Sequence, residues 1–206
     1  MKTVIILAAG SGSRCNLGYN KLLYKISNKM LIEYTLEKFK GYDIIITVSA
    51  VDYELFVKKF PNYKIVLGGK TRQESVYKAM LICESENILI HDGARIFVDT
   101  DTILRVENAL TDVVAVLPSV VVKDSIKDQN GKNIDRSNIY IAQTPQGVKR
   151  SVYLSCIDKE CSDDVTVIEK CGFEVVMVNG SYSNIKITTI EDLEYAKFKL
   201  GGNNDL

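Results

Sequence analysis

The chain alternates short, almost continuously apolar runs with longer segments in which apolar residues recur at helical spacing. The short runs have the length and the β-branched content of buried strands, and they lie at 4–7, 44–48, 64–67, 87–91, 113–117 and 173–178. The spacing predicts helices at 30–39, 53–60, 71–83, 102–110, from about 147 through 153–154, 163–171 and 190–200. Apolar strands that alternate with helices are typical of a mostly parallel sheet covered on both faces. We therefore expect one three-layer α/β domain over residues 1–206.

The pattern changes after Pro118. Residues 120–127 alternate apolar and polar positions, 128–131 have the composition of a turn, and 134–142 can return as a second strand. This predicts a β-hairpin arm at about 120–143, inserted into the α/β domain. Because apolar side chains exposed on such an arm need a cover, we expect a homodimer that forms through it.

Composition narrows the classes of protein. The 26 Lys and Arg residues balance the 26 Asp and Glu residues, which argues against a dedicated nucleic-acid or membrane-surface protein. No apolar run is long enough for a membrane span, and no signal segment precedes the first strand, so we expect a cytoplasmic protein. Five cysteines without a C-x-x-C pair favour free thiols over a zinc cluster or disulfides, and the only histidine is His91.

The first strand opens into a loop of small residues, A-A-G-S-G-S at 8–13, followed by Arg14 and Lys21. Small residues let backbone amides approach a ligand, and nearby cations suit a polyphosphate. An ordinary strand-to-helix turn is the alternative for so short a motif. The dinucleotide fingerprint would need a third glycine where Cys15 stands, and no G-K-[ST] follows Gly10, so neither a Rossmann nor a Walker-type site is indicated.

Three further polar motifs also follow predicted strands. A glycine turn at 68–75 leads into a helix, and its amides could bind a base edge or a ribose. The alternative is an ordinary helix N-terminus that is capped by Thr71 and binds no ligand. In H-D-G-A-R at 91–95, Asp92 is suited to hold Mg²⁺, although Arg95 has the alternative of simply pairing with it. We expect His91 to be a satisfied strand-end residue. The fourth motif, 184–189, presents Lys186.

The carboxyl ends of parallel strands meet at one edge of a sheet. We therefore expect these motifs to form one positive bowl around Asp92, with cations from four loops: Arg14, Lys21, Arg95 and Lys186. Positioning and charge neutralisation are what transfer at phosphorus requires, without a covalent nucleophile.

Taken in order, the motifs make a more specific pattern, which consists of L-A-A-G-S-G-S-R with a lysine seven residues later, G-G-K-T-R-Q-E-S-V, H-D-G-A-R, V-K-D-S-I-K, D-R-S-N-I-Y-I-A-Q-T-P-Q-G, S-D-D-V and N-I-K-I-T-T. Over essentially its whole length, the chain resembles the 2-C-methyl-D-erythritol 4-phosphate cytidylyltransferases of the non-mevalonate isoprenoid pathway. The resemblance implies a Rossmann-like nucleotidyltransferase fold and transfer of CMP from CTP to the sugar-alcohol phosphate, with release of pyrophosphate and with Mg²⁺ as cofactor.

The resemblance also implies residue roles. The cytidine nucleotide would be held by Ala8, Ala9, Gly10, Gly12, Gly69, Ser75 and Gly93. Arg14, Lys21 and Lys186 would stabilise the reacting phosphates, and Asp92 would stand near the metal with Arg95 and Thr144 beside it. Ser125 and Arg136 lie on the arm and would bind the sugar phosphate in the partner's active site.

Some positions depart from the usual family pattern, namely Asn20, Leu22, Lys70, Ile96 and Ser162. Lys70, where the family usually has aspartate, puts one nucleotide contact in doubt. Two alternatives stay open: a ribitol 5-phosphate cytidylyltransferase, which shares most CTP motifs, and a nucleotide-binding regulator that has lost catalysis. The intact set of Arg14, Lys21, Asp92 and Lys186 argues against the regulator.

Overall fold

The computed structural model describes residues 2–10, 15, 17–156, 161 and 163–201. Its strands are β1 Thr3–Ala8, β2 Lys25–Ile26, β3 Lys29–Met30, β4 Asp43–Val48, β5 Lys64–Leu67, β6 Asn87–Asp92, β7 Ala115–Val121, β8 Ile126–Lys127, β9 Asn133–Ile134, β10 Tyr140–Ala142, β11 Gln146–Lys149 and β12 Val176–Asn179. Its helices are the 3₁₀ turn η2 Lys21–Leu23 and α1 Leu31–Lys38, α2 Tyr53–Lys59, α3 Arg72–Leu81, α4 Thr100–Ala109, α5 Arg150–Ser155, α6 Asp164–Lys170 and α7 Ile190–Lys199.

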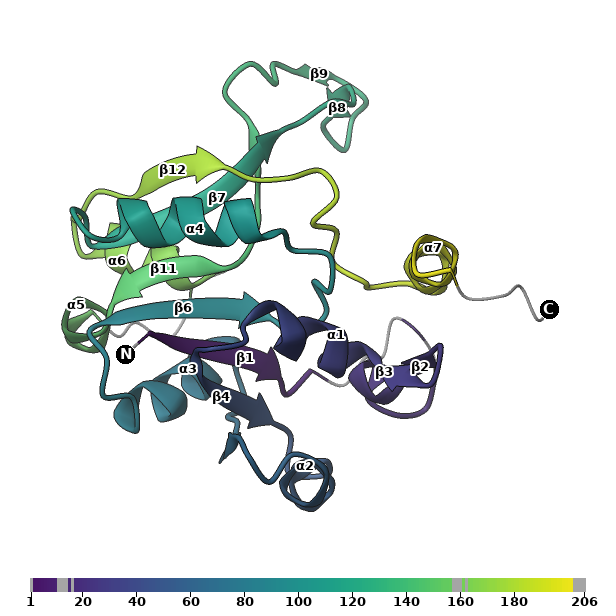
Figure 1. Cartoon of the computed structure of the whole chain (residues 1–206). Helices are drawn as coiled ribbons and strands as arrows, with labels where there is room; N and C mark the ends of the chain where they lie inside the picture. The colour runs from purple at the N-terminus through teal and green to yellow at the C-terminus, as the bar shows by residue number, and fades with distance from the viewer. Residues whose placement is uncertain (1, 11–14, 16, 157–160, 162, 202–206) are drawn as a thin grey trace.

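An eight-stranded sheet forms the centre of the molecule (Figure 1). Its order is β10-β7-β11-β6-β1-β4-β5, and β12 also pairs with β7. The ladders between β6, β1, β4 and β5 are parallel, as is the ladder between β7 and β12, whereas β10 and β11 run antiparallel to their neighbours. The predicted fold class, a mostly parallel α/β sheet, is therefore confirmed.

Helices cover both faces because successive strand residues point to opposite sides. On β1, Val4 and Ile6 belong to the core on the face covered by α1 and α4, while Ile5 packs with residues of α3, α5 and α6 on the other face. All three β1 residues are fully buried. This packing on both faces explains why the strands read as continuous apolar runs.

Three element predictions were wrong or incomplete. The chain after Pro145 first forms strand β11, whose Gly147 pairs with Leu89 of β6, and helix α5 begins only at Arg150. Strand β7 runs through Pro118 to Val121, because β12 pairs with it as far as Ser119 and β10 pairs with it from Ser119 to Val121. Strand β12 spans 176–179 instead of 173–178. The short β2–β3 ladder was not predicted.

Between β7 and β10 the chain leaves the sheet, and Figure 1 shows this segment projecting beyond it. The segment carries β8 and β9, which pair antiparallel in the register Ile126 with Ile134. Asp128 closes the intervening turn, since its carboxylate accepts hydrogen bonds from the backbone N–H groups of Asn130 and Lys132 at 2.9 and 2.8 Å. Among the described residues, no helix is long and apolar enough to cross a membrane, and none of the five cysteines forms a disulfide.

Candidate active site

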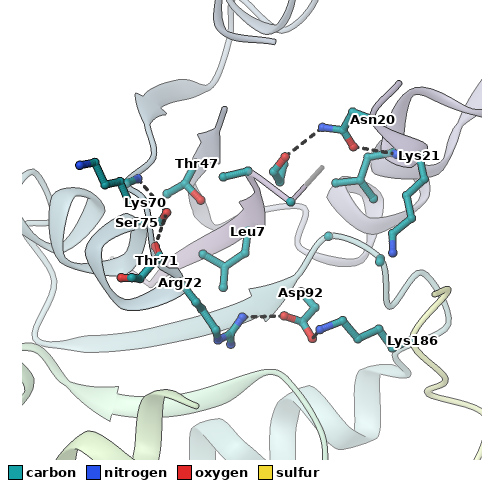
Figure 2. Close-up of a pocket in the computed structure, with 17 residues that line it drawn as sticks. Leu7, Asn20, Lys21, Thr47, Lys70, Thr71, Arg72, Ser75, Asp92 and Lys186 are labelled. Atoms are coloured by element: carbon teal, nitrogen blue, oxygen red, sulfur yellow. Dashed lines mark hydrogen bonds and ion pairs between the residues drawn. The ribbon is translucent and has the colours of Figure 1, made fainter. Parts of the chain in front are cut away.

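A cavity of about 540 Å³ opens at the carboxyl ends of β1, β4 and β6 (Figure 2). Its walls come from six parts of the chain: the end of β1, the η2 turn, Thr47 of β4, the glycine turn with the start of α3, the end of β6 with the two residues after it, and Lys186. Sequence-predicted residues that line it are Ala8, Ala9, Gly10, Lys21, Gly69, Ser75, Asp92, Gly93 and Lys186. Gly12 and Arg14 lie outside the described residues. The structure thus gathers four of the predicted motifs at one edge of the sheet.

The glycine turn packs against the end of β1. A Cβ on Gly68 would lie 2.9 Å from the Cβ of Ala9, so the two loops approach as closely as they do because residue 68 has no side chain. Thr71 caps α3 by accepting a hydrogen bond from the N–H of Glu74 at 3.1 Å. This is the helix cap that was stated as the alternative for this motif. Ser75 accepts from the N–H of Gly69 at 2.9 Å and donates to the carbonyl of Thr71 at 3.0 Å.

Asp92 is the electrostatic centre of the cavity. Its carboxylate lies 2.7 Å from Arg72 Nη1, 2.9 Å from Lys186 Nζ and 3.4 Å from Arg95 Nε. Burial alone would raise the pKa of Asp92, but the charges of Arg72, Lys186 and Arg95 hold it well below its usual range. Asp92 is therefore ionised at any physiological pH. Figure 2 shows Arg72 and Lys186 approaching it from opposite sides.

Arg72 and Asp164 form a pair that sequence analysis missed. The guanidinium of Arg72 reaches Asp164 Oδ2 at 2.5 Å with Nη2 while it holds Asp92 with Nη1. Asp164 is completely buried at the start of α6, and Gln146 Oε1 accepts hydrogen bonds from its backbone N–H and that of Val165. Both residues stand inside motifs already named, but they are 92 positions apart, and no sequence signal indicates that they meet.

His91 is a satisfied buried residue, as predicted. Its Nε2–H donates to the carbonyl of Arg95 at 3.2 Å, so Nδ1 accepts from the hydroxyl of Thr144 at 3.0 Å. Burial lowers the pKa of His91 to about 3, which keeps the ring neutral. The Thr144 hydroxyl also accepts from the backbone N–H of Asp92 at 3.1 Å. Thr144 therefore supports the Asp92 backbone from behind the cavity wall.

Arg95 is directed mainly toward the backbone. It donates to the carbonyl of Asn184 at 2.7 Å and to that of Ala142 at 3.4 Å, in addition to its pairing with Asp92, and that pairing was the alternative stated for it. The Asn184 amide in turn donates to the carbonyl of Thr144 at 2.8 Å. These contacts fix the loop that presents Lys186, so Arg95 acts on the site by holding its parts together.

Two of the glycine amides expected to face the nucleotide, those of Gly69 and Gly93, are already bonded within the protein. The N–H of Gly93 donates to the carbonyl of Leu7 at 3.0 Å, and that of Gly69 donates to Ser75. A Cβ on Gly93 would lie 2.9 Å from Leu22 Cδ1. Gly93 therefore serves close packing of the cavity floor, and neither glycine offers an unbonded N–H in this structure.

Ser125 and Arg136 are exposed on the projecting segment and do not line the cavity of their own chain. Within the residues that the structure describes, no three His, Cys, Asp or Glu side chains gather to hold a metal ion. Asp92 offers a single carboxylate at the cavity. That donor set fits Mg²⁺ carried in on phosphate oxygens, which commonly takes one or two protein carboxylates, and does not fit a cation caged by the protein alone.

Comparison with known proteins agrees with this geometry. The family model of 2-C-methyl-D-erythritol 4-phosphate cytidylyltransferase matches residues 2–202. Proteins of that name from Clostridium botulinum and Geobacillus thermodenitrificans are 37% and 36% identical to the chain, with 93% and 94% of each sequence covered.

Solved structures give the same result. A 4-diphosphocytidyl-2C-methyl-D-erythritol synthase from Anaerococcus prevotii is 28% identical with a TM-score of 0.83, and 98% of both chains is covered. The bifunctional IspDF from Campylobacter jejuni is 29% identical with a TM-score of 0.85, and the chain spans 54% of that longer protein.

Proposed function

The chain belongs to the 2-C-methyl-D-erythritol 4-phosphate cytidylyltransferase family, and we propose that its cavity transfers CMP from CTP to 2-C-methyl-D-erythritol 4-phosphate. Membership makes it a nucleotidyltransferase. The observation that carries the proposal is that Lys21, Lys186 and Asp92 line one cavity together with a glycine turn, with Lys186 2.9 Å from Asp92. Cations together with small, close-packed backbone suit a nucleoside triphosphate.

In the proposed reaction, a phosphate oxygen of the sugar-alcohol phosphate attacks the α-phosphorus of CTP. A new P–O bond forms, the bond to the β-phosphate breaks, and pyrophosphate leaves with the electron pair. Lys21 and Lys186, with Arg14, neutralise charge that builds up on the α-phosphate and the leaving group. The attacking phosphate is an anion at neutral pH, so the residues need not remove a proton from it.

Mg²⁺ is part of the proposal. It would bind to the triphosphate and to Asp92, and it would supply neutralisation of the phosphate charges when bound. The ammonium of Lys186 contacts Asp92 Oδ2 at 2.9 Å, so it lies next to the proposed metal ligand in the cavity. Lys186 can therefore exchange its carboxylate contact for a phosphate contact when CTP enters.

We also propose one domain over residues 1–206, with an arm at about 120–143 that pairs two chains into a homodimer. Its support is a set of apolar side chains near the arm that are more than a third exposed, namely Val121, Ile134, Tyr140, Ile141 and Tyr182. A second cavity of about 460 Å³ lies at the base of the arm, between Tyr140 and Met177. Ser125 and Arg136 would then reach the partner's cavity.

Pyrophosphate release from CTP tests the function directly. Turnover is expected with 2-C-methyl-D-erythritol 4-phosphate and Mg²⁺, and ribitol 5-phosphate serves as the comparison substrate. Turnover with ribitol 5-phosphate alone would overturn the choice of substrate. CTP binding without turnover of either substrate would identify a regulator instead.

A further inference from the structure

Asn20 is buried at the mouth of the cavity and uses both ends of its side-chain amide. Its Nδ2 donates to the carbonyl of Ala8 at 3.0 Å and to Asp52 Oδ2 at 2.9 Å. Its Oδ1 accepts from the backbone N–H of Leu22 at 3.0 Å, and only 5% of the residue is exposed. One side chain thus joins the end of β1, the η2 turn and the start of α2. Figure 2 shows Asn20 with dashed contacts at both ends of its amide.

The contact to Leu22 acts directly on Lys21. Asn20 is the N-cap of η2, and its side chain closes the turn across Lys21, which lies between the two bonded residues. A capped turn restricts the backbone from which the lysine side chain leaves. The direction of the Lys21 ammonium toward the cavity therefore depends on the Asn20 amide.

The contact to Ala8 acts on the nucleotide side. In a trans peptide the carbonyl and the following N–H point in opposite directions. Because Asn20 holds the Ala8 carbonyl, it also fixes the direction of the Ala9 N–H, and Ala9 lines the cavity. A single amide therefore sets a backbone donor and a cation that face the same ligand.

Asp52 prevents the Asn20 amide from turning over. Its Oδ2 also accepts a hydrogen bond from the hydroxyl of Ser49 at 2.8 Å, so the carboxylate is itself held in place. A carboxylate accepts hydrogen bonds and cannot donate them, which requires that the NH₂ end of Asn20 faces Asp52. The oxygen end is then directed to Leu22.

We propose that Asn20 is a positioning residue for nucleotidyl transfer, which aims Lys21 at the triphosphate and orients the Ala8–Ala9 peptide. The proposal rests on the proposed function, since it gives Lys21 a role in transfer. It predicts that the effect of Asn20 on kcat depends on Lys21. Part of the effect of Asn20 on CTP affinity depends on Ala9 instead and is independent of Lys21.

A double-mutant cycle on the full chain tests this. Asn20→Ala is expected to lower kcat about 10- to 100-fold, the scale for a misplaced catalytic group. In the Lys21→Ala background the same substitution should lower kcat by less than about threefold, because the group that it positions is gone. Asn20→Ser keeps a capping oxygen for Leu22 and should retain more kcat than Asn20→Ala. Asn108→Ala, on an exposed part of α4, is the matched control.

Equal losses of kcat in the two backgrounds would overturn the proposal, because a purely structural asparagine would act whether or not Lys21 is present. Thermal unfolding of each variant identifies loss of fold, and Asn20→Ser then carries the cycle. If wild-type protein releases no pyrophosphate from CTP, the proposed function fails separately. The cycle is then read from CTP dissociation constants by calorimetry, where additive effects of Asn20→Ala and Lys21→Ala would again overturn the proposal.

Discussion

Lys21 and Lys186, two of the three lysines that line the cavity, differ in what surrounds them, and both should matter for the chemical step. Lys186 contacts Asp92 at 2.9 Å, and Lys21 lies on the turn capped by Asn20. Lys21→Ala or Lys186→Ala is expected to lower kcat by a factor on the order of 10² to 10³, the scale for losing one contact to transition-state charge. Steady-state kinetics measure this, with the exposed Lys40→Ala as a charge-matched control. Unchanged kcat in both cavity variants would contradict the assigned roles.

Arg72 should contribute strongly to the free energy of unfolding, although 26% of its side chain is exposed. It is the partner of the completely buried Asp164, whose pKa burial raises to about 6 even beside Arg72. Removing Arg72 therefore leaves this buried carboxyl either charged without its partner or forced to take up a proton, and both states cost stability. Arg72→Ala is therefore expected to lower the free energy of unfolding by about 3–5 kcal/mol in urea titrations.

The compensating variant identifies the cause of that loss. Adding Asp164→Asn to Arg72→Ala removes the stranded charge and should recover a large part of the lost stability. A double variant that is less stable than Arg72→Ala would show that the loss in free energy of unfolding comes from lost packing and not from the charge of Asp164.

At the scale of residues, the sequence predicted those site residues whose place depends only on their position along one strand. Asp92 ends a strand, so its place at the ligand edge could be foreseen. The Arg72–Asp164 pair could not, because it depends on the packing that brings the first residues of α3 and α6 together, and sequence periodicity does not encode which helix ends meet. Nor could the bonded amides of Gly69 and Gly93 be foreseen, since their partners depend on loop conformation.

Helix α4 offers a test at the scale of one element. Asp99 is its N-cap and accepts from the N–H of Thr102 at 2.6 Å. Burial alone would raise the pKa of Asp99, but hydrogen bonds from Thr102 and the charge of Arg105 lower it below its ordinary value of 3.8. A lowered pKa in the folded state means that the ionised cap stabilises the protein above pH 3.8 and that this stabilisation is lost as the pH falls through the folded value.

Asp99→Ala should therefore cost about 1 kcal/mol at pH 7 and less at an acidic pH below the folded pKa of Asp99, measured as the free energy of unfolding. Asp99→Asn keeps an uncharged capping oxygen and should retain most of the stability at pH 7. The exposed Asp112→Ala is the control. A loss from Asp99→Ala that is the same at both pH values would contradict a charge-dependent cap.

The elements that the sequence missed are those whose existence depends on distant partners. Strand β11 has four residues and contains a glycine, so it has little apolar signal of its own. It forms because β6 and β7 leave a place between them, where Gly147 lies against Val106 of α4 without room for a Cβ. The long parallel strands were predictable because burial on both faces requires an apolar run.

At the scale of the whole molecule, the open point is whether Arg136 acts in the cavity of its own chain or in that of a partner chain. It is exposed on the arm and does not line the cavity of its own chain. If the proposed dimer places each arm at its partner's cavity, light scattering of the full chain should give twice the monomer mass at micromolar concentration. Arg136→Ala should raise KM for the sugar phosphate and leave CTP affinity unchanged.

Mixing two impaired variants, Arg136→Ala and Lys186→Ala, decides the arrangement when the sugar phosphate is kept well below the KM of the Arg136→Ala variant. A dimer of Arg136→Ala with Lys186→Ala has one site with its own Lys186 and the partner's Arg136, and one site that lacks both. Random reassociation into closed two-fold dimers should thus restore about a quarter of wild-type activity, because half of the dimers are mixed and half of their sites are intact. Activity that stays at the level of the separate variants would place Arg136 in its own chain's site or outside the reaction. One variant keeps Lys186 and the other keeps Arg136. Activity can therefore recover only if the arm of one chain reaches the cavity of the other.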